Sequence, residues 1–365
     1  MLSLHIDTAK TWRGGQKQVM LTVLGLRATG CKTVLLAHPQ GELFRRMNSD
    51  KDLFPIAARS EGDLFAAWKL SSFLQNIKPA IVHVHDAHGL ALAAVAIRFL
   101  RTDLKPKLIA SRRVDFHLKT NVFSRWKYRQ VDQFICASSF IRTLLISNKI
   151  PTNKITVIYE GIDIKSNQKT DPLNIHAEFR VPEDSLIVGN VAALVPHKGQ
   201  RYLVDAAAQV IRQVPNARFF IAGEGSLAVT LQNQISRLGL KNHVFLTGFR
   251  NDVLSMIKSF DLFVMSSTTE GLGTSALDAM ACETPVIATR AGGLSEVIVH
   301  GQSGLLVPAK NAEALASGII EMLRNESFRL SCSLQGLKRA EKKFSATRMV
   351  EETLMAYKNL VDTNA

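Results

Sequence analysis

The residues best suited to chemistry lie between positions 266 and 281, where two acids, Glu270 and Asp278, stand eight positions apart. The apolar run before them predicts a strand that ends near Met265, and a helix is expected to begin near Gly273. The free N–H groups and the dipole of such a helix start attract an anion such as a phosphate. Asp278, more than one turn into the helix, could accept hydrogen bonds from two ribose or sugar hydroxyls. A capped helix that carries acids by chance is the alternative.

Three more positions could contact the same kind of anion. Gly14 and Gly15 follow the first expected strand, so their missing Cβ atoms would let the backbone approach a diphosphate. Lys198, near the start of the second half, would place a positive charge on that diphosphate as charge builds on a leaving group. An ordinary glycine turn and a surface lysine are the alternatives.

Histidines gather at the end of another expected strand. His83, His85 and His88 surround Asp86, and neighbouring side chains of a strand point to opposite faces, so they cannot all enter the core. We expect His88 or Asp86 to face the reacting sugar.

The sequence predicts no metal site and no disulfide framework. The Asp50-Lys51-Asp52 pattern lies in a polar stretch that ends no strand, so we expect a surface loop there. The four cysteines are far apart and form no C-x-x-C pair, which fits a reducing compartment: Cys31, Cys136, Cys282 and Cys332.

Short β-branched runs alternate with amphipathic stretches along the whole chain, a pattern typical of parallel sheets with crossover helices. The expected strands are Leu2–Ile6, Thr33–Ala37, Ala80–His85, Lys107–Ala110, Gln133–Ala137, Ile155–Tyr159, Leu186–Val191, Ala217–Ala222, His243–Leu246, Leu262–Met265, Pro285–Ala288 and Gly304–Val307. The polar stretch Ser166–Asn174 between the two series predicts a linker. With 365 residues, 46% of them hydrophobic, the chain can fill two cores.

We therefore expect an α/β protein with domains at 1–165 and 166–345, and a final helix, 346–365, that packs back on the first domain. Two doubly wound domains would place ligands at the carboxyl ends of their strands, in a cleft between the sheets.

Positive charge is concentrated in the first half: residues 1–165 hold 25 basic and 12 acidic side chains, a net of +13 out of the +14 of the whole chain. Aromatic residues are interleaved with the bases between positions 98 and 130, which suits an anionic membrane surface or an acidic acceptor. A solvated basic face is the alternative, and no nucleic-acid-binding signature accompanies the charge. The expected contacts are Arg112, Arg113, Lys119, Arg125, Trp126 and Lys127.

The N-terminus lacks the features of a signal peptide, and no apolar run is long enough to span a bilayer. We expect a cytoplasmic protein bound peripherally to the inner face of the cytoplasmic membrane.

Several short segments, in order along the chain, resemble the signatures of glycosyltransferase family 4. They are Trp12–Gly15, His83–His88, Val195–Gly199, Gly223–Gly225, Leu246–Asp252, Glu270–Ala281, Cys282–Thr289 and Ala291–Ile298. The resemblance covers nearly the full length and implies the GT-B fold, with two Rossmann-like domains facing across a cleft. It also implies retaining transfer of a sugar from a nucleoside diphosphate, in which the leaving phosphate helps to deprotonate the acceptor.

The resemblance also implies roles for residues. Glu270 would contact the donor sugar, Asp278 the ribose, and the backbone at 248–250 would border the base. Catalysis is expected from Lys198, Glu270, His88 and Asp86. Donor binding is expected from Gly14, Gly15, Lys198, Gly248, Phe249, Arg250, Glu270, Gly271, Leu272, Gly273, Thr274 and Asp278. The implied partners are a nucleotide sugar and a lipid-linked or acidic saccharide acceptor, with no separate cofactor; an acceptor of bacterial lipopolysaccharide or other surface polysaccharide assembly fits this reading.

The chain departs from the family pattern at three places. An aspartate stands at 278 where many members have glutamate, no arginine precedes Lys198 in Val191–Leu194, and Arg112 lies near a position that often holds histidine. Phosphate binding would then lean on Lys198, main-chain amides and the side chains of Arg13 or Arg250.

Other functions fit parts of the sequence. Gly271-x-Gly273-x-x-Ala276 spells a dinucleotide-binding pattern, which would suit an NAD(P)-dependent oxidoreductase, but Glu270 directly before it would repel a pyrophosphate. A noncatalytic nucleotide-sugar-binding protein and a sugar epimerase are further alternatives.

Overall fold

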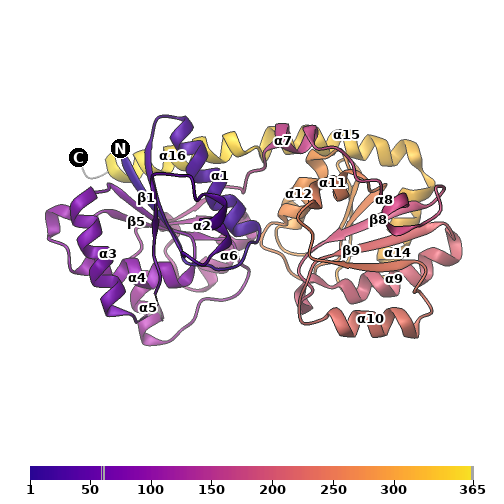
Figure 1. Cartoon of the computed structure of the whole chain (residues 1–365), viewed down its shortest axis with the longest axis horizontal. Helices are drawn as coiled ribbons and strands as arrows, with labels where there is room; N and C mark the ends of the chain where they lie inside the picture. The colour runs from indigo at the N-terminus through magenta and orange to yellow at the C-terminus, as the bar shows by residue number, and fades with distance from the viewer. Residues whose placement is uncertain (59, 61, 363–365) are drawn as a thin grey trace. The chain divides into compact units, whose positions relative to one another are not determined.

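The computed structural model describes residues 1–58, 60 and 62–362. The chain divides into two compact units, one of residues Met1–Gly161 with Ala346–Ala365, the other of Ile162–Ser345. Each unit is built around one parallel β-sheet with helices on both faces (Figure 1).

The sheet of the first unit has the order β3-β2-β1-β4-β5-β6-β7, with every neighbouring pair parallel. Its strands are β1 (Leu2–Asp7), β2 (Lys32–Ala37), β3 (Leu53–Pro55), β4 (Ile81–Val84), β5 (Lys107–Arg112), β6 (Gln133–Cys136) and β7 (Ile155–Val157). The direction in which the strand order grows reverses between β1 and β4. The carboxyl ends of these two strands are therefore the place where such sheets bind ligands.

Helices cover both faces of this sheet. They are α1 (Gly14–Ala28), α2 (Glu42–Arg46), α3 (Leu64–Ile77), α4 (Ala87–Arg98), α5 (Val122–Arg129), α6 (Ser139–Ser147) and α16 (Ala346–Asp362). Helices α3, α4 and α5 lie side by side, and α16 packs along α1 (Figure 1). The contact with α16 is close, because a Cβ at Gly25 of α1 would lie 2.3 Å from a methyl group of Val350.

The second unit repeats the design with the order β10-β9-β8-β11-β12-β13, again all parallel. Its strands are β8 (Leu186–Val191), β9 (Ala217–Ala222), β10 (Val244–Gly248), β11 (Leu262–Met265), β12 (Val286–Thr289) and β13 (Leu305–Val307). Its helices are α7 (Ile164–Lys169), α8 (Ile175–Phe179), α9 (Gln200–Gln213), α10 (Ala228–Arg237), α11 (Val253–Lys258), α12 (Thr274–Ala281), α13 (Leu294–Val297), α14 (Ala312–Arg324) and α15 (Glu326–Lys343). The reversal lies between β8 and β11.

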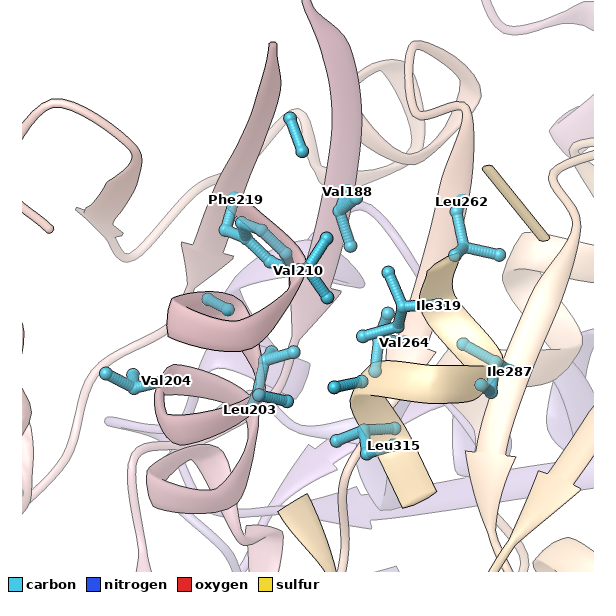
Figure 2. Close-up of a cluster of buried hydrophobic side chains, with 14 of the residues drawn as sticks. Val188, Leu203, Val204, Val210, Phe219, Leu262, Val264, Ile287, Leu315 and Ile319 are labelled. Carbon is cyan, nitrogen blue, oxygen red and sulfur yellow. The ribbon is translucent and has the colours of Figure 1, made fainter. Parts of the chain in front are cut away.

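A core of branched aliphatic side chains holds the helices of the second unit to its sheet. Figure 2 shows Val210 of α9 beside Val188 of β8, with Leu203 of α9 and the α14 residues Leu315 and Ile319 in the same cluster. All five side chains are at most 1% exposed, and burial of each stabilises the fold by about 1.5–3 kcal/mol. This packing fixes the strand ends from which the functional loops leave.

The expected fold class, two Rossmann-like α/β units, is confirmed. The predicted linker at 166–174 is wrong in part, because α7 begins at Ile164 and runs to Lys169. Asp163 starts this helix by accepting a hydrogen bond from the N–H of Ser166 (3.1 Å), and the polar composition concealed the element. The short edge strand β3 was also missed, since it has three residues and no alternation.

Candidate functional site

In the second unit, the loops after β8 and β11 bring a lysine and a glutamate together. The Nζ atom of Lys198 lies 2.6 Å from an Oε2 atom of Glu270, and Ser267 Oγ donates to the same oxygen (3.1 Å). Both charged side chains are less than one-fifth exposed, at 19% and 12%. A half-buried ion pair at this position keeps two opposite charges ready for a ligand that carries phosphate and hydroxyl groups.

Close backbone packing fixes the lysine loop against the glutamate loop. Gly199 follows Lys198 with φ +64°, and a Cβ there would lie 2.1 Å from the carbonyl oxygen of Ser266. The N–H of Thr268 donates to the carbonyl of His197 (2.7 Å). Only glycine permits this approach, so the position of the Lys198 side chain is set by the fold.

Helix α12 begins at this loop without a side-chain cap. Its N-cap residue, Gly273, has φ +98°, and a Cβ there would lie 2.5 Å from a methyl group of Leu294. The N–H of Ala276 donates to the carbonyl of Gly273 (3.0 Å), and the helix start before it, at Thr274 and Ser275, has the backbone N–H groups and the dipole that suit an anion. Gly271 and Leu272 are buried beneath the loop, so they shape its backbone rather than offering side chains.

Asp278 lies in the second turn of α12 and is half-buried. Its Oδ1 atom accepts a hydrogen bond from the Nδ2 atom of Asn167, at 3.0 Å. Asn167 belongs to α7, inside the segment that the sequence predicted to be a linker, and nothing in the local pattern pointed to it.

The loop after β10 offers a ring and a paired arginine. Phe249 follows Gly248 and is 53% exposed, which leaves its ring available for stacking. The guanidinium of Arg250 instead bonds the carboxylates of Asp252 (2.5 and 2.8 Å) and Glu178 (2.5 Å). These bonds raise the pKa of Arg250. A diphosphate would have to compete with these two acids for the guanidinium, and the expected contact stays a prediction.

In the first unit, the loops after β1 and β4 are joined by neutral hydrogen-bond donors. Asp86 accepts bonds from the N–H (2.6 Å) and hydroxyl (2.8 Å) of Thr8, and from the N–H of Gly89 (2.8 Å) at the start of α4. This carboxylate caps a helix and fixes a loop. These bonds give Asp86 a structural role, and the expectation that His88 or Asp86 faces the reacting sugar stays a prediction.

The glycines of the first unit open α1 beside those loops. A Cβ at Gly15 would meet no atom within 4 Å, so the space above this helix start is open to a ligand. Nearby, burial and the charge of Asp86 raise the pKa of Asp7, the last residue of β1, to about 6. Arg13, the N-cap residue of α1, is exposed at the same helix start.

His88 is exposed and lines a pocket of about 720 Å³ at this edge of the sheet. Sequence reasoning missed most of the lining, because the residues come from separate loops and from α3. The other lining residues are Thr8, Lys10, His38, Ala57, Ala58, Asp63, Phe65, Ala66 and Lys69. Two lysines, Lys10 and Lys69, and one carboxylate, Asp63, are the charged groups in this lining.

Beneath these loops, His5, His83 and His85 form a buried cluster with Tyr357 of α16. The contacts run from Arg113 Nη1 to His85 Nδ1 (3.1 Å), then from His85 Nε2 to His5 Nδ1 (2.9 Å). They continue from His5 Nε2 to Tyr357 Oη (3.4 Å), from Tyr357 Oη to His83 Nδ1 (2.5 Å), and from His83 Nε2 to Ser111 Oγ (2.7 Å).

A single proton assignment satisfies this whole chain of contacts. A guanidinium only donates, so His85 accepts at Nδ1 and carries its proton on Nε2, and the same tautomer follows for His5 and His83. Burial first, and then the charge of Arg113 and neighbouring groups, lowers the pKa of all three histidines, that of His5 to about 3.

The three imidazoles have nitrogens within 4.8 Å of one another, a spacing that could hold a metal ion. The hydrogen bonds disfavour that role. A histidine that binds a metal donates its second N–H to an acceptor, whereas Arg113 donates to His85 and directs the proton to the nitrogen that faces His5. We interpret the cluster as a hydrogen-bonded core that ties β1, β4 and β5 to α16.

Two of the predicted basic contacts are not on the surface. Arg113 pairs with Glu160 (3.0 Å) at 16% side-chain exposure, and Lys127 is 1% exposed with its Nζ donating to the carbonyl of Ala87 (3.3 Å). Their assignment to a membrane surface is wrong, because Lys127 lies on the inward face of α5 and Arg113, just after β5, is paired in the interior. Arg112 is half-buried and bonds the carbonyl of Phe116.

The rest of the basic segment is accessible. Lys119 and Arg125 are exposed and Trp126 is half-buried. Large apolar side chains stand exposed among them: Phe116, Val122 and Phe123. Among the described residues, no helix combines the length and apolarity needed to cross a bilayer.

Comparison with known proteins assigns both halves to one kind of protein. A family model named Glycosyltransferase Family 4 matches residues 12–166, and a model named Glycosyl transferases group 1 matches residues 172–339. An uncharacterized glycosyltransferase of Methanocaldococcus jannaschii is 31% identical over 67% of the chain and 64% of its own length. The chain spans less than two thirds of this relative and of a second glycosyltransferase from the same organism.

Two further similarities cover more of the molecule. The capsular polysaccharide biosynthesis glycosyltransferase CapM of Staphylococcus aureus is 24% identical over 81% of the chain and 80% of its own length. The crystal structure of HepE of Anabaena in complex with UDP and glucose superposes with a TM-score of 0.85, at 22% identity, over 98% of this chain and all of the other. The two family models together account for both units, so the chain carries a Glycosyltransferase Family 4 domain followed by a Glycosyl transferases group 1 domain.

Proposed function

We propose that the protein transfers a sugar, with retention of its anomeric configuration, from a nucleoside diphosphate to an acceptor bound by the first unit. The observation that carries this proposal is the contact between Lys198 and Glu270 beside the uncapped start of α12. A cation and a helix start suit a diphosphate, and a carboxylate suits the sugar hydroxyls, so one loop pair serves both parts of the donor.

Each residue then has a role in the donor complex. When the donor binds, Lys198 leaves Glu270 and pairs with the diphosphate. It then offsets the negative charge that builds on the diphosphate as the bond to the sugar breaks. Glu270 accepts hydrogen bonds from the sugar, Asp278 accepts them from the ribose, and the exposed ring of Phe249 borders the base.

Retention of configuration is the finer part of the proposal and rests on family membership. The bond from C1 to the diphosphate oxygen breaks, the acceptor oxygen attacks C1 on the same face, and the leaving oxygen takes the acceptor proton. NMR of the first-formed product gives the anomeric configuration. The same configuration as in the donor supports the proposal, and an inverted one refutes this part of it.

The acceptor is proposed to be an acidic or lipid-linked saccharide in the pocket beside His88. Lys10 and Lys69 supply positive charge there, and Leu64 and Trp68 stand exposed on the same helix as Lys69. The similarity to CapM supports an acceptor of the polysaccharide type.

Binding to the cytoplasmic face of the membrane is proposed for the accessible part of the basic segment. Lys119 and Arg125 attract anionic lipid, and Phe116 and Val122 can enter the interface. The double variant Lys119→Glu/Arg125→Glu should lose co-sedimentation with vesicles of phosphatidylglycerol at low salt. Equal binding of the variant and the original protein would refute this surface.

The donor site is tested by thermal unfolding of the full chain with a panel of nucleotide sugars and nicotinamide dinucleotides. We expect stabilisation by one nucleotide sugar and its diphosphate, and loss of this shift in Lys198→Ala but not in Lys241→Ala, which changes an exposed lysine of the same unit. A shift with dinucleotides alone would favour an oxidoreductase. Binding without transfer or donor hydrolysis would favour a noncatalytic protein.

A further inference from the structure

Helix α7 lies near the start of the second unit and contacts α12, the helix that carries Asp278. Asp278 is the residue proposed to bind the ribose. Asn167, in the middle of α7, is 1% exposed, and its Nδ2 atom donates to Asp278 Oδ1 at 3.0 Å. Cys282 Sγ, just past the end of α12, contacts the carbonyl of Asn167 at 3.9 Å. Lys258 Nζ of α11 donates to the carbonyl of Gln168 (2.5 Å). Helix α7 is therefore fastened to both α11 and α12.

The hydrogen bond fixes the orientation of the Asp278 carboxylate. An aspartate on a helix has few rotamers, and a buried amide that donates to one oxygen selects among them. A carboxylate has about four lone-pair positions, and the bond from Asn167 uses one of those on Oδ1.

We propose that Asn167 is a positioning residue that aims Asp278 at the ribose and so makes the enzyme prefer ribonucleotides over 2′-deoxyribonucleotides. This inference rests on the proposed function, since it requires a nucleoside diphosphate bound at α12. It adds a specificity determinant that lies outside every segment of the family signature. A side chain that only joined α7 to α12 would not discriminate between ligands that differ by one hydroxyl.

The test compares dissociation constants of the full chain for UDP and 2′-deoxy-UDP, and for GDP and 2′-deoxy-GDP, by calorimetry. In the unaltered protein the ribose form should bind about tenfold or more tightly, as a hydrogen bond to a charged group supplies. Asn167→Ala should lower this ratio severalfold while the affinity for the deoxy form changes little. Asp278→Ala should bring the ratio near one.

A matched control is Asn216→Ala, which also removes an amide hydrogen bond in the second unit, from Asn216 to the carbonyl of Asp184 (2.7 Å). Asn216 precedes β9, at the amino end of the sheet, so its variant should keep the ratio. If Asn167→Ala does not fold, Asn167→Ser and Asp278→Ala carry the test.

The inference fails if the Asn167 variants weaken ribose and deoxyribose forms equally or change neither. It also fails if Asp278→Ala keeps the full preference for ribose. If the unaltered protein binds none of the four nucleotides, the proposed function fails with it, and this result is distinguishable from the others.

Discussion

The two units place the same pair of loops at the same point of the same topology, yet they join those loops differently. After β8 and β11, Lys198 and Glu270 form an ion pair. After β1 and β4, the carboxylate of Asp86 accepts hydrogen bonds from neutral donors. Thr8 supplies two of them, and the N–H of Gly89 supplies the one that caps α4. An ion pair can be exchanged for a charged substrate, whereas a cap must persist for the helix to start. From this difference we propose that the second unit carries the reaction chemistry and that the loops of the first unit are held in position.

The largest effect is expected at Glu270. Glu270→Gln keeps the shape of the side chain but removes the charge that faces Lys198, so kcat should fall by about 10²–10³-fold. Steady-state transfer of labelled sugar measures kcat, and calorimetry with the free diphosphate serves as the control, because that ligand should still bind. A kcat close to that of the unaltered protein would show that the charge of Glu270 has no role in catalysis.

Acidification should destabilise the first unit through its buried histidines. Their pKa values are lowered in the folded chain, so the unfolded chain alone binds protons below about pH 6.5, and stability falls as the pH drops from there. Each histidine lowers the free energy of unfolding by up to about 1.4 kcal/mol per pH unit, which makes roughly 4 kcal/mol per pH unit for the three. Asp7 opposes this below pH 6, where its own protonation favours the folded state.

Thermal unfolding between pH 7 and 5 measures this slope. His85→Gln keeps a hydrogen-bonding amide without a titrating group and should make the slope shallower, whereas the exposed His117→Gln should leave it unchanged. Identical slopes in all three proteins would contradict the assignment of neutral imidazoles.

Asp86 should behave as a structural counterpart of Glu270. Asp86→Ala loses the cap of α4 and the bonds to Thr8, which should lower the stability by about 2 kcal/mol. The kcat of the folded fraction should fall far less than in Glu270→Gln. Thermal unfolding and steady-state kinetics of the two variants test this. An equally large loss of kcat in Asp86→Ala and Glu270→Gln would contradict the different roles given to the two acids.

The smallest effect is expected at the hydrogen bond between Tyr357 of α16 and His83. Tyr357→Phe removes the hydroxyl that donates to His83, at a cost of about 1 kcal/mol. Tyr202→Phe, at a partly exposed tyrosine of the second unit, should have a smaller effect on the melting temperature. Equal effects would indicate that the contact with His83 contributes little.

The sequence predicted features that are local and missed those that depend on distant pairing. Lys198, Glu270 and the start of α12 follow strands whose apolar runs are plain, so their place at strand ends could be inferred. The contact between Tyr357 and His5 joins residues 352 positions apart, and no local pattern indicates it. The contact of Asn167 with Asp278 could not be predicted for the same reason, because Asn167 lies in a stretch whose polar composition suggested a linker.

Charge counting failed where helix and strand faces decide exposure. Lys127 and Arg113 contributed to the predicted basic surface, but one faces α4 and the other a buried glutamate. Lys119 and Arg125, in the same segment, are exposed as expected. Periodicity within α5 could have separated Lys127 from its exposed neighbours, since it lies on the face that packs inward.

The most direct test of the division between the units is calorimetric binding of UDP and GDP to the full chain and to two lysine variants. Lys198→Ala should weaken the diphosphate that binds by about tenfold or more, because it removes a charge-assisted contact, and Lys10→Ala in the first unit should leave the affinity nearly unchanged. Weaker binding in Lys10→Ala with an unaffected Lys198→Ala would contradict the account and place the nucleotide in the first unit.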